Sequence, residues 1–154
     1  NIITMLTLKE MIKLTIEFYN SLGIKISKED EMMAVQSLTM PEYAKEYNDK
    51  LNEKINDHRA LSTVGDAICG AYIMLKEYNI DVTSEELTDK KKIVTNEHLN
   101  IIGETLLSNK LFAMNNDLKE GNKKSYATAF EAMIGFISII NKNKVDEILN
   151  KYLI

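Results

Sequence analysis

The sequence has few residues that interrupt helices and few that cross-link a chain. Its 154 residues include one proline, six glycines, one cysteine and no tryptophan. So few helix breakers favour long helices over many short strands and turns, and we therefore expect an all-α fold. The lone Cys69 excludes an internal disulfide, and its apolar helical neighbourhood predicts a small buried side chain.

Long hydrophobic runs are also missing. No window reaches the roughly 18 uninterrupted apolar residues that a transmembrane helix requires, and the first residues lack the basic start and cleavage site of a signal peptide. Together with the single cysteine, this favours a reducing compartment, so we expect a cytoplasmic protein with no membrane partner. The chain also lacks a Gly-rich phosphate loop, a cysteine pair and a Ser-His-Asp pattern, so the chemistries of those motifs have no support.

The composition that remains is that of an ordinary globular protein, with 45% hydrophobic and 27% charged residues. We expect one domain over residues 1–154, with N-terminal helices in 1–57 and motif-bearing helices in 58–154. The net charge of −4 counts against strong non-specific binding to nucleic acid. Lysines gather at 90–92 and at 119–124, which leaves a locally basic face open, although such clusters more often form a solvated helix surface.

Hydrophobic periodicity predicts helices along the whole chain. The first is expected to end near Gly23, the second to begin near Ser27, and the third to carry Pro41 in its first turn. The fourth, from about residue 61 to 78, is apolar or small almost all round, which predicts a buried helix. Three further helices and a short amphipathic C-terminal one are expected, the first of them capped by Thr83 or Ser84 and carrying the lysine triplet.

Two of these helices each carry a single acid among small residues. Asp66 lies in Leu-Ser-Thr-Val-Gly-Asp-Ala, and Glu131 lies in Ala-Thr-Ala-Phe-Glu-Ala-Met-Ile-Gly. Ser62 precedes Asp66 by four residues and Thr128 precedes Glu131 by three, so each helix presents a hydroxyl and a carboxylate on one face. Because small side chains let two backbones approach closely, the two acids can come within reach of one ion.

A divalent cation would relieve the repulsion between two such carboxylates. Mg²⁺ suits the site, since it takes oxygen ligands, needs only one or two carboxylates and keeps several waters. A structural pair that caps or salt-bridges buried helix ends is the alternative, and spacing alone does not decide between them. His58 and His98 lack the spacing of metal ligands, and we expect each at the surface or at a helix cap.

Three segments together resemble the ribonuclease III family. Residues 61–67 are similar to its signature Leu-Glu-Phe-Leu-Gly-Asp-Ala, residues 87–99 to its stretch from Leu-Thr through a basic segment to Asn-Glu-x-Leu, and residues 127–135 to its Ala-Asp-x-Phe-Glu-Ala-x-x-Gly. They occur in the family's order and separation. Asp66 and Glu131 match two of the family's four site acids, whereas Ser62 and Thr128 occupy the other two positions. The chain is most similar to the mini-ribonuclease III branch, which also lacks those two acids, has a second motif like residues 126–132, and has no double-stranded-RNA-binding domain.

The resemblance implies a homodimer with the signature helices packed across a two-fold axis, and a valley that holds double-stranded RNA. It assigns Asp66 and Glu131 as catalytic and Mg²⁺-binding residues (with Mn²⁺ able to substitute), and Ser62 and Thr128 as holders of outer-shell waters. Lys119, Lys123 and Lys124 are expected to reach RNA phosphates.

The sequence thus predicts a metal-dependent endoribonuclease for double-stranded RNA, in RNA processing such as ribosomal RNA maturation. With weak intrinsic affinity, a helper or ribosomal protein is an expected partner. Two alternatives stay open: a non-catalytic RNA-binding or ribosome-associated scaffold, and a helical dimerisation module with a chance match.

Overall fold

The computed structural model describes residues 5–92, 96–118 and 125–153, and every regular element within these ranges is helical. The all-α prediction is therefore confirmed. The elements in chain order are α1 (Leu8–Ser21), η1 (Lys28–Asp30), α2 (Glu31–Ser37), α3 (Pro41–Leu51), α4 (Arg59–Glu77), α5 (Ser84–Lys92), α6 (Asn96–Leu107), η2 (Asn115–Leu118), α7 (Ser125–Ile140) and α8 (Lys142–Tyr152), where η marks a 3-10 helix. No helix of the described ranges is long and apolar enough to cross a membrane.

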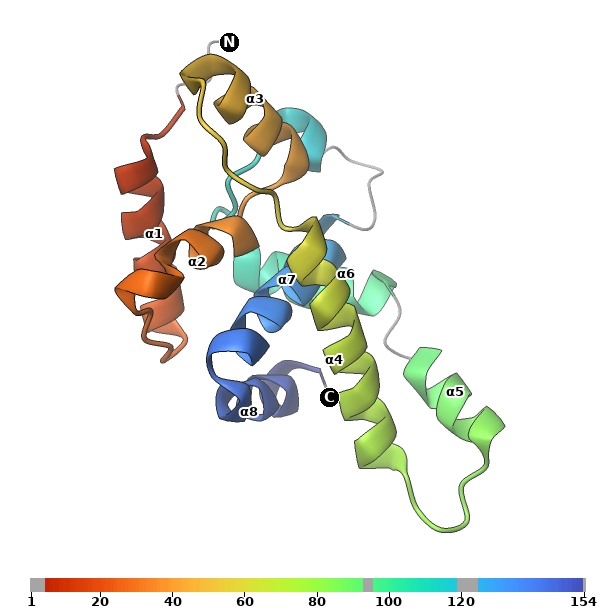
Figure 1. Cartoon of the computed structure of the whole chain (residues 1–154). Coiled ribbons are helices and arrows are strands. Elements are labelled where there is room, and N and C mark those ends of the chain that lie inside the picture. The colour runs from red at the N-terminus through yellow and green to blue at the C-terminus, as the bar shows by residue number, and fades with distance from the viewer. Residues whose placement is uncertain (1–4, 93–95, 119–124, 154) are drawn as a thin grey trace.

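Helix α7 is the centre of the molecule (Figure 1). Most of its side chains are buried, including Phe130, Met133 and Phe136 at 0% exposure. They are buried because α7 carries apolar or small residues on nearly every side. Its most extensive contacts are with α4, followed by α6. Helices α1 and α2 cover another side, where Tyr19 of α1 packs against Phe136 with ring centroids 4.9 Å apart.

Most helix ends lie where the sequence places them. Gly23 takes the left-handed φ of 76° just after α1, and Pro41 occupies the first turn of α3. The Thr83 hydroxyl accepts a hydrogen bond from the Glu86 amide at 3.1 Å and so caps α5. Ser27 differs slightly, because its hydroxyl donates to the Asp30 carboxylate and a 3-10 turn precedes α2.

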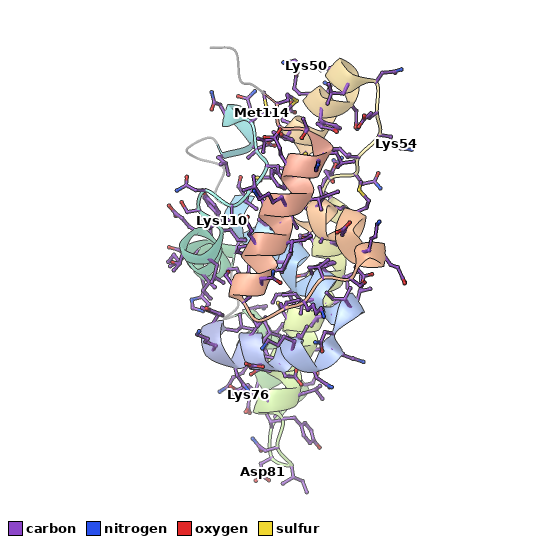
Figure 2. All side chains as sticks on the ribbon, turned by 90° about the vertical axis from the view of Figure 1, so that its left-hand side faces the viewer. Lys50, Lys54, Lys76, Asp81, Lys110 and Met114 are labelled. Carbon is purple, nitrogen blue, oxygen red and sulfur yellow. The ribbon has the colours of Figure 1, made fainter. Side chains whose placement is uncertain are left out.

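The prediction that the fourth helix is buried nearly all round is wrong. Its buried residues are confined to one stripe, which contains Leu61, Gly65 and Cys69, while Leu75 and Tyr78 are 80% and 64% exposed. Figure 2 shows why: Lys76, near the end of α4, and Asp81 lie at the end of the molecule opposite Lys50 and Lys54. The end of α4 thus extends past the core, and α5 and α8 are among the helices that contact α4.

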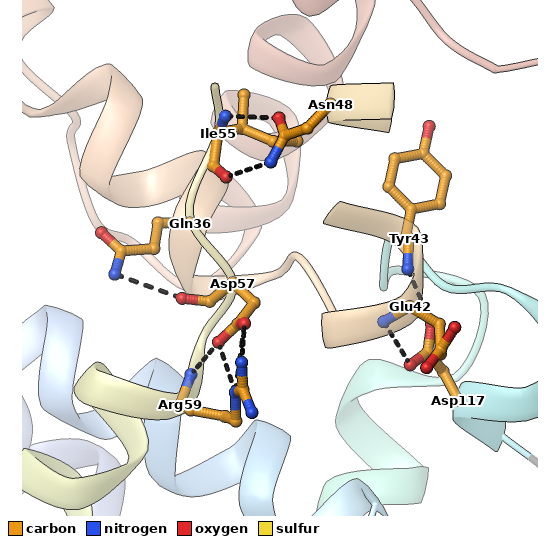
Figure 3. Close-up of polar contacts among 8 residues, drawn as sticks. All are labelled: Gln36, Glu42, Tyr43, Asn48, Ile55, Asp57, Arg59 and Asp117. Carbon is orange, nitrogen blue, oxygen red and sulfur yellow. Dashed lines mark hydrogen bonds and ion pairs between the residues drawn. The ribbon is translucent and has the colours of Figure 1, made fainter. Parts of the chain in front are cut away.

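Hydrogen bonds fix the segment that leads into α4 (Figure 3). The Asn48 side chain donates to the Ile55 carbonyl at 3.0 Å and accepts from the Ile55 amide at 2.7 Å. The Gln36 amide donates to the Asp57 carbonyl, and the Asp57 carboxylate accepts from both the backbone amide and the guanidinium of Arg59. The start of α4 is therefore held in place independently of its packing on α7.

Candidate metal and active site

Glycines bring α4 and α7 into backbone contact. A Cβ added to Gly65 would overlap the carbonyl oxygen of Glu131, and one added to Gly135 would overlap the carbonyl oxygen of Leu61. Each helix therefore contributes a glycine at the point where the other helix's backbone passes. The structure confirms the expectation that small residues in these two segments let the helices approach closely, and the approach places Asp66 beside Glu131.

Asp66 and Glu131 form a coupled carboxyl pair. Their side chains lie within hydrogen-bonding distance of each other, with Asp66 exposed and Glu131 only 8% exposed. Burial raises the pKa of Glu131, and the hydrogen bond and the negative charge of Asp66 raise it further, to about 8. Burial and the neighbouring carboxyl group thus both favour the protonated form of Glu131.

The pair fits a divalent cation better than a structural ion pair. Within the described ranges neither acid makes an ion pair with a lysine or arginine, so no protein cation offsets their charges. No cluster of three or more His, Cys, Asp and Glu side chains occurs in those ranges either. A site with two carboxylates and open positions for water is one that Mg²⁺ accepts, whereas zinc sites ordinarily use more protein ligands.

The two hydroxyl residues keep the helical register that the sequence predicts. Ser62 is 8% exposed and lies one turn before Asp66 on α4, while Thr128 is half-buried and lies one turn before Glu131 on α7. Thr128 also lines a pocket of about 350 Å³ that Asp66 and Glu131 do not line. Each hydroxyl stands next to its carboxylate along the helix, and the assignment of both to outer-shell waters stays a prediction.

His58 lies at a helix cap, one of the two places that the sequence predicts, but it is buried and its side chain does not cap the helix. It occupies the N-cap position of α4, but its side chain makes no cap hydrogen bond and is only 2% exposed. Burial lowers the pKa of its imidazole, which is therefore neutral at neutral pH. The backbone explains the placement, because the His58 amide donates to the Thr39 carbonyl at 2.9 Å and draws the residue inward. His98, by contrast, is exposed as expected.

Cys69 is buried, as predicted, one turn beyond Gly65 on α4. Burial raises the pKa of its thiol to about 12, and the charges of Glu131 and Asp66 add to this. The thiol is therefore protonated and inert at neutral pH, which excludes it as a nucleophile.

Sequence reasoning missed Asp117, which ties η2 to the start of α3 (Figure 3). Its buried carboxylate accepts hydrogen bonds from the backbone amides of Glu42 at 3.0 Å, Tyr43 at 3.2 Å and Met114 at 2.9 Å. Nothing in the polar segment around it marks this one aspartate, because two of its three partners lie 75 and 74 positions away in sequence. Lys119, Lys123 and Lys124, predicted to contact RNA, lie outside the described residues.

The raised pKa of Glu131 predicts a pH-dependent stability. The unfolded carboxyl titrates near 4.5 and the folded one near 8, so between these values the folded state holds the extra proton. The metal-free protein should therefore lose unfolding free energy as pH rises from about 4.5 to 8. Urea unfolding in EDTA at pH 5.5, 7 and 8.5 measures this. Glu131→Gln should flatten that part of the profile, and an identical profile in both proteins would contradict the assigned pKa.

Comparison with known proteins agrees with the geometry. No protein-family model matches the chain. It is 28% identical over 124 residues to "Ribonuclease 3" of Flavobacterium psychrophilum, an alignment that covers 75% of this chain and 50% of that protein. The chain thus spans about half the length of this curated relative.

A solved structure shows the same fold. It is the nuclease domain of ribonuclease III from Campylobacter jejuni, whose description concerns structural flexibility in a region involved in dimer formation. The two chains superpose with a TM-score of 0.67 at 15% sequence identity, over 87% of this chain and 92% of that one. The predicted resemblance is confirmed, and the chain is ribonuclease III-like in sequence and has the fold of that nuclease domain.

Proposed function

We propose that this ribonuclease III-like chain is a divalent-metal-dependent endoribonuclease that cuts double-stranded RNA. The observation that carries the proposal is the Asp66–Glu131 pair, two adjacent carboxyl groups that make no ion pair with a lysine or arginine in the described structure. The pair lies where glycine packing fixes two helices of a nuclease-domain fold. The resemblance of its two segments to the ribonuclease III motifs supports the same activity.

Each residue of the pair has a distinct part in this proposal. A bound Mg²⁺ or Mn²⁺ would supply charge stabilisation at the phosphate and a water of lowered pKa for hydrolysis. The exposed Asp66 and the buried Glu131 would hold the ion, and Glu131 would have to release the proton that its raised pKa favours. Ser62 and Thr128 stand one turn away on the two helices and would hold waters of the outer shell.

We propose further that two copies associate through α4. An exposed row of apolar side chains runs along this helix at intervals of three and four residues: Val64, Ala67, Ala71, Leu75 and Tyr78. Beside it lies a groove of about 720 Å³ between α4 and α8. Exposed apolar rows of this length mark association surfaces, and a two-fold axis lets one row pack on its copy. Sedimentation equilibrium tests this, and a monomer at every concentration would contradict it.

The substrate is proposed from shape recognition. A helical domain with a valley between two copies would hold A-form RNA through its phosphates and 2′-hydroxyls, without reading base edges. The net charge of −4 predicts weak, salt-sensitive affinity. By resemblance to the mini-ribonuclease III branch, we propose structured precursors of ribosomal RNA as the substrate. We also propose a ribosomal or helper protein that adds affinity, and a cytoplasmic location.

Metal titration with an end-labelled RNA duplex tests the function. We expect discrete cut products that appear with Mg²⁺ or Mn²⁺, disappear in EDTA, and do not form from a DNA duplex of the same sequence. The competing outcome is a non-catalytic scaffold, because Ser62 and Thr128 stand where the family pattern has two further acids. Binding of the RNA without cleavage at every metal concentration would establish the scaffold and overturn the nuclease.

A further inference from the structure

A lysine of α5 lies across α4 at Gly70, one helical turn beyond Asp66. If Gly70 carried a Cβ, that atom would stand 2.8 Å from Cε of Lys91 and 3.4 Å from its Nζ. The side chain of Lys91 thus occupies the space that the missing side chain of Gly70 leaves open. Figure 1 shows α5 returning beside the second half of α4, the arrangement that makes this contact.

This position is near the proposed metal site. Gly70 follows Asp66 by four residues, so the two share one face of α4 and lie about 6 Å apart along its axis. The Lys91 ammonium makes no ion pair with Asp66 or with any other acid that the structure describes. Lys91 does not neutralise the pair, because the causes that set the pKa of Glu131 include no lysine and its ammonium therefore lies beyond ionic contact with Glu131.

Lys91 differs from the lysines on either side of it. Lys90 pairs with Glu77 at 3.4 Å, and Lys92 pairs with Asp89 at 3.7 Å. Lys91 is exposed and has no hydrogen-bonded or ionic partner in the described ranges. Its ammonium is a strongly hydrated point charge with three donors, a type of group that commonly binds phosphate. A phosphodiester strand held at the two carboxylates through a metal ion would carry its negative charge past this part of α4. An ammonium without an ionic partner there can bind one of its phosphates.

We propose that Lys91 binds a backbone phosphate of the RNA beside Asp66 and Glu131, from a position against α4 that it can occupy because residue 70 is glycine. This inference rests on the proposed function for its ligand, a nucleic-acid phosphate. It assigns RNA binding to the middle lysine of the 90–92 triplet, whereas the sequence pattern alone favours the lysines of 119–124. Lys91 would thereby fix the position of the strand relative to the carboxyl pair.

Lys91→Gln is expected to weaken RNA binding and cleavage, and Lys90→Gln is the matched control. In Lys91→Gln, kcat/KM for the RNA duplex should fall about tenfold or more, because a charge-assisted contact is lost. The slope of log Kd against log salt, measured by fluorescence anisotropy in EDTA, should decrease by about one. Lys91→Arg should retain most of the affinity. Lys90→Gln should match the unmodified protein, since Lys90 already pairs with Glu77.

Gly70→Ala provides a second test that leaves the lysine in place. The added methyl group meets only the flexible end of Lys91 and no backbone, so the protein should fold with unchanged or slightly higher stability. It should nevertheless lose RNA affinity in the same direction as Lys91→Gln, because Lys91 is displaced from α4. Retained affinity in Gly70→Ala would show that the packing of Lys91 against Gly70 does not position the lysine for RNA.

The outcomes separate this inference from the proposed function. If the unmodified chain cuts RNA and Lys91→Gln matches it in rate and in salt slope, the lysine proposal is overturned and the nuclease stands. If the unmodified chain does not cut, the nuclease proposal fails. The salt slope of binding still decides the role of Lys91 in that case, because it requires no cleavage.

Discussion

Asp66→Asn and Glu131→Gln are each expected to reduce cleavage of duplex RNA by about 10³-fold or more. Each change removes one of the two charged oxygen ligands while nearly preserving the volume of the side chain. With one carboxylate left, the site loses both cation affinity and the charge that positions the hydrolytic water. Initial rates on an end-labelled duplex at saturating Mg²⁺ measure the loss, and circular dichroism and sedimentation should show an unchanged helical, self-associated protein.

The control for these variants is an exposed acid outside the site. Glu104→Gln on α6 changes charge by the same amount at a solvent-exposed position, and should keep full activity. Glu131→Gln should in addition be more stable than the unmodified protein at pH 8.5 in EDTA, because it removes a carboxyl that is partly ionised there although buried. Full activity in either site variant would refute the assignment of that residue.

The second large effect concerns stability. Gly65→Ala should destabilise the protein by about 3 kcal/mol or more, because the added Cβ overlaps the backbone carbonyl of Glu131 and cannot be accommodated by a side-chain rotation. To remove this overlap, α4 and α7 would have to move apart, although the contact between them is the most extensive between any two helices. Urea unfolding measures the change in unfolding free energy, and a protein too unstable to purify is an extreme case of the same result.

Gly70→Ala is the matched control for Gly65→Ala, since both put the same methyl group on the same helix. At residue 70 the methyl group meets only the end of a lysine side chain, so the unfolding free energy should stay the same or rise slightly. An unfolding midpoint of Gly65→Ala equal to that of Gly70→Ala would mean that α4 and α7 are not in backbone contact. The carboxyl pair would then lack the scaffold that holds it together.

The glycine contact links the fold to the site. Gly65 directly precedes Asp66 on α4. The backbone atom that packs against Gly65 is the carbonyl oxygen of Glu131. The closest approach of the two helices is therefore also the point where the two acids meet. A change that widens this contact should weaken metal binding in proportion, because the distance between two carboxylates decides whether one ion can bridge them.

Much of the architecture was predictable because it depends on neighbours in sequence. Pro41, Gly23 and Thr83 act through local backbone conformation and local hydrogen bonds, and all three lie at helix ends as predicted. The close approach of Asp66 and Glu131 was predictable for a different reason. Both acids stand among small residues, and that composition on two helices favours one packing arrangement.

Other features depend on contacts between distant segments, and local patterns do not contain them. The amide of His58 is drawn inward by Thr39, and Asp117 finds its partners at the start of α3. Residues 61–78 are apolar or small on nearly every side of the helix, which predicts burial. Part of that surface is nevertheless exposed because the helix extends beyond the core. Hydrophobicity measures the tendency of a surface to be covered and does not say which molecule covers it.

The sequence by itself determined that this protein is helical, that two of its helices pack closely through small residues, and that one acid on each can come close to the other. It could do so because helix periodicity and side-chain size are properties of short segments. Only the tertiary structure decided that Glu131 is buried and Asp66 exposed, that Lys91 lies across Gly70, and that a face of α4 is left uncovered. Each of these depends on where one helix ends relative to another, which the summed packing of the whole chain sets.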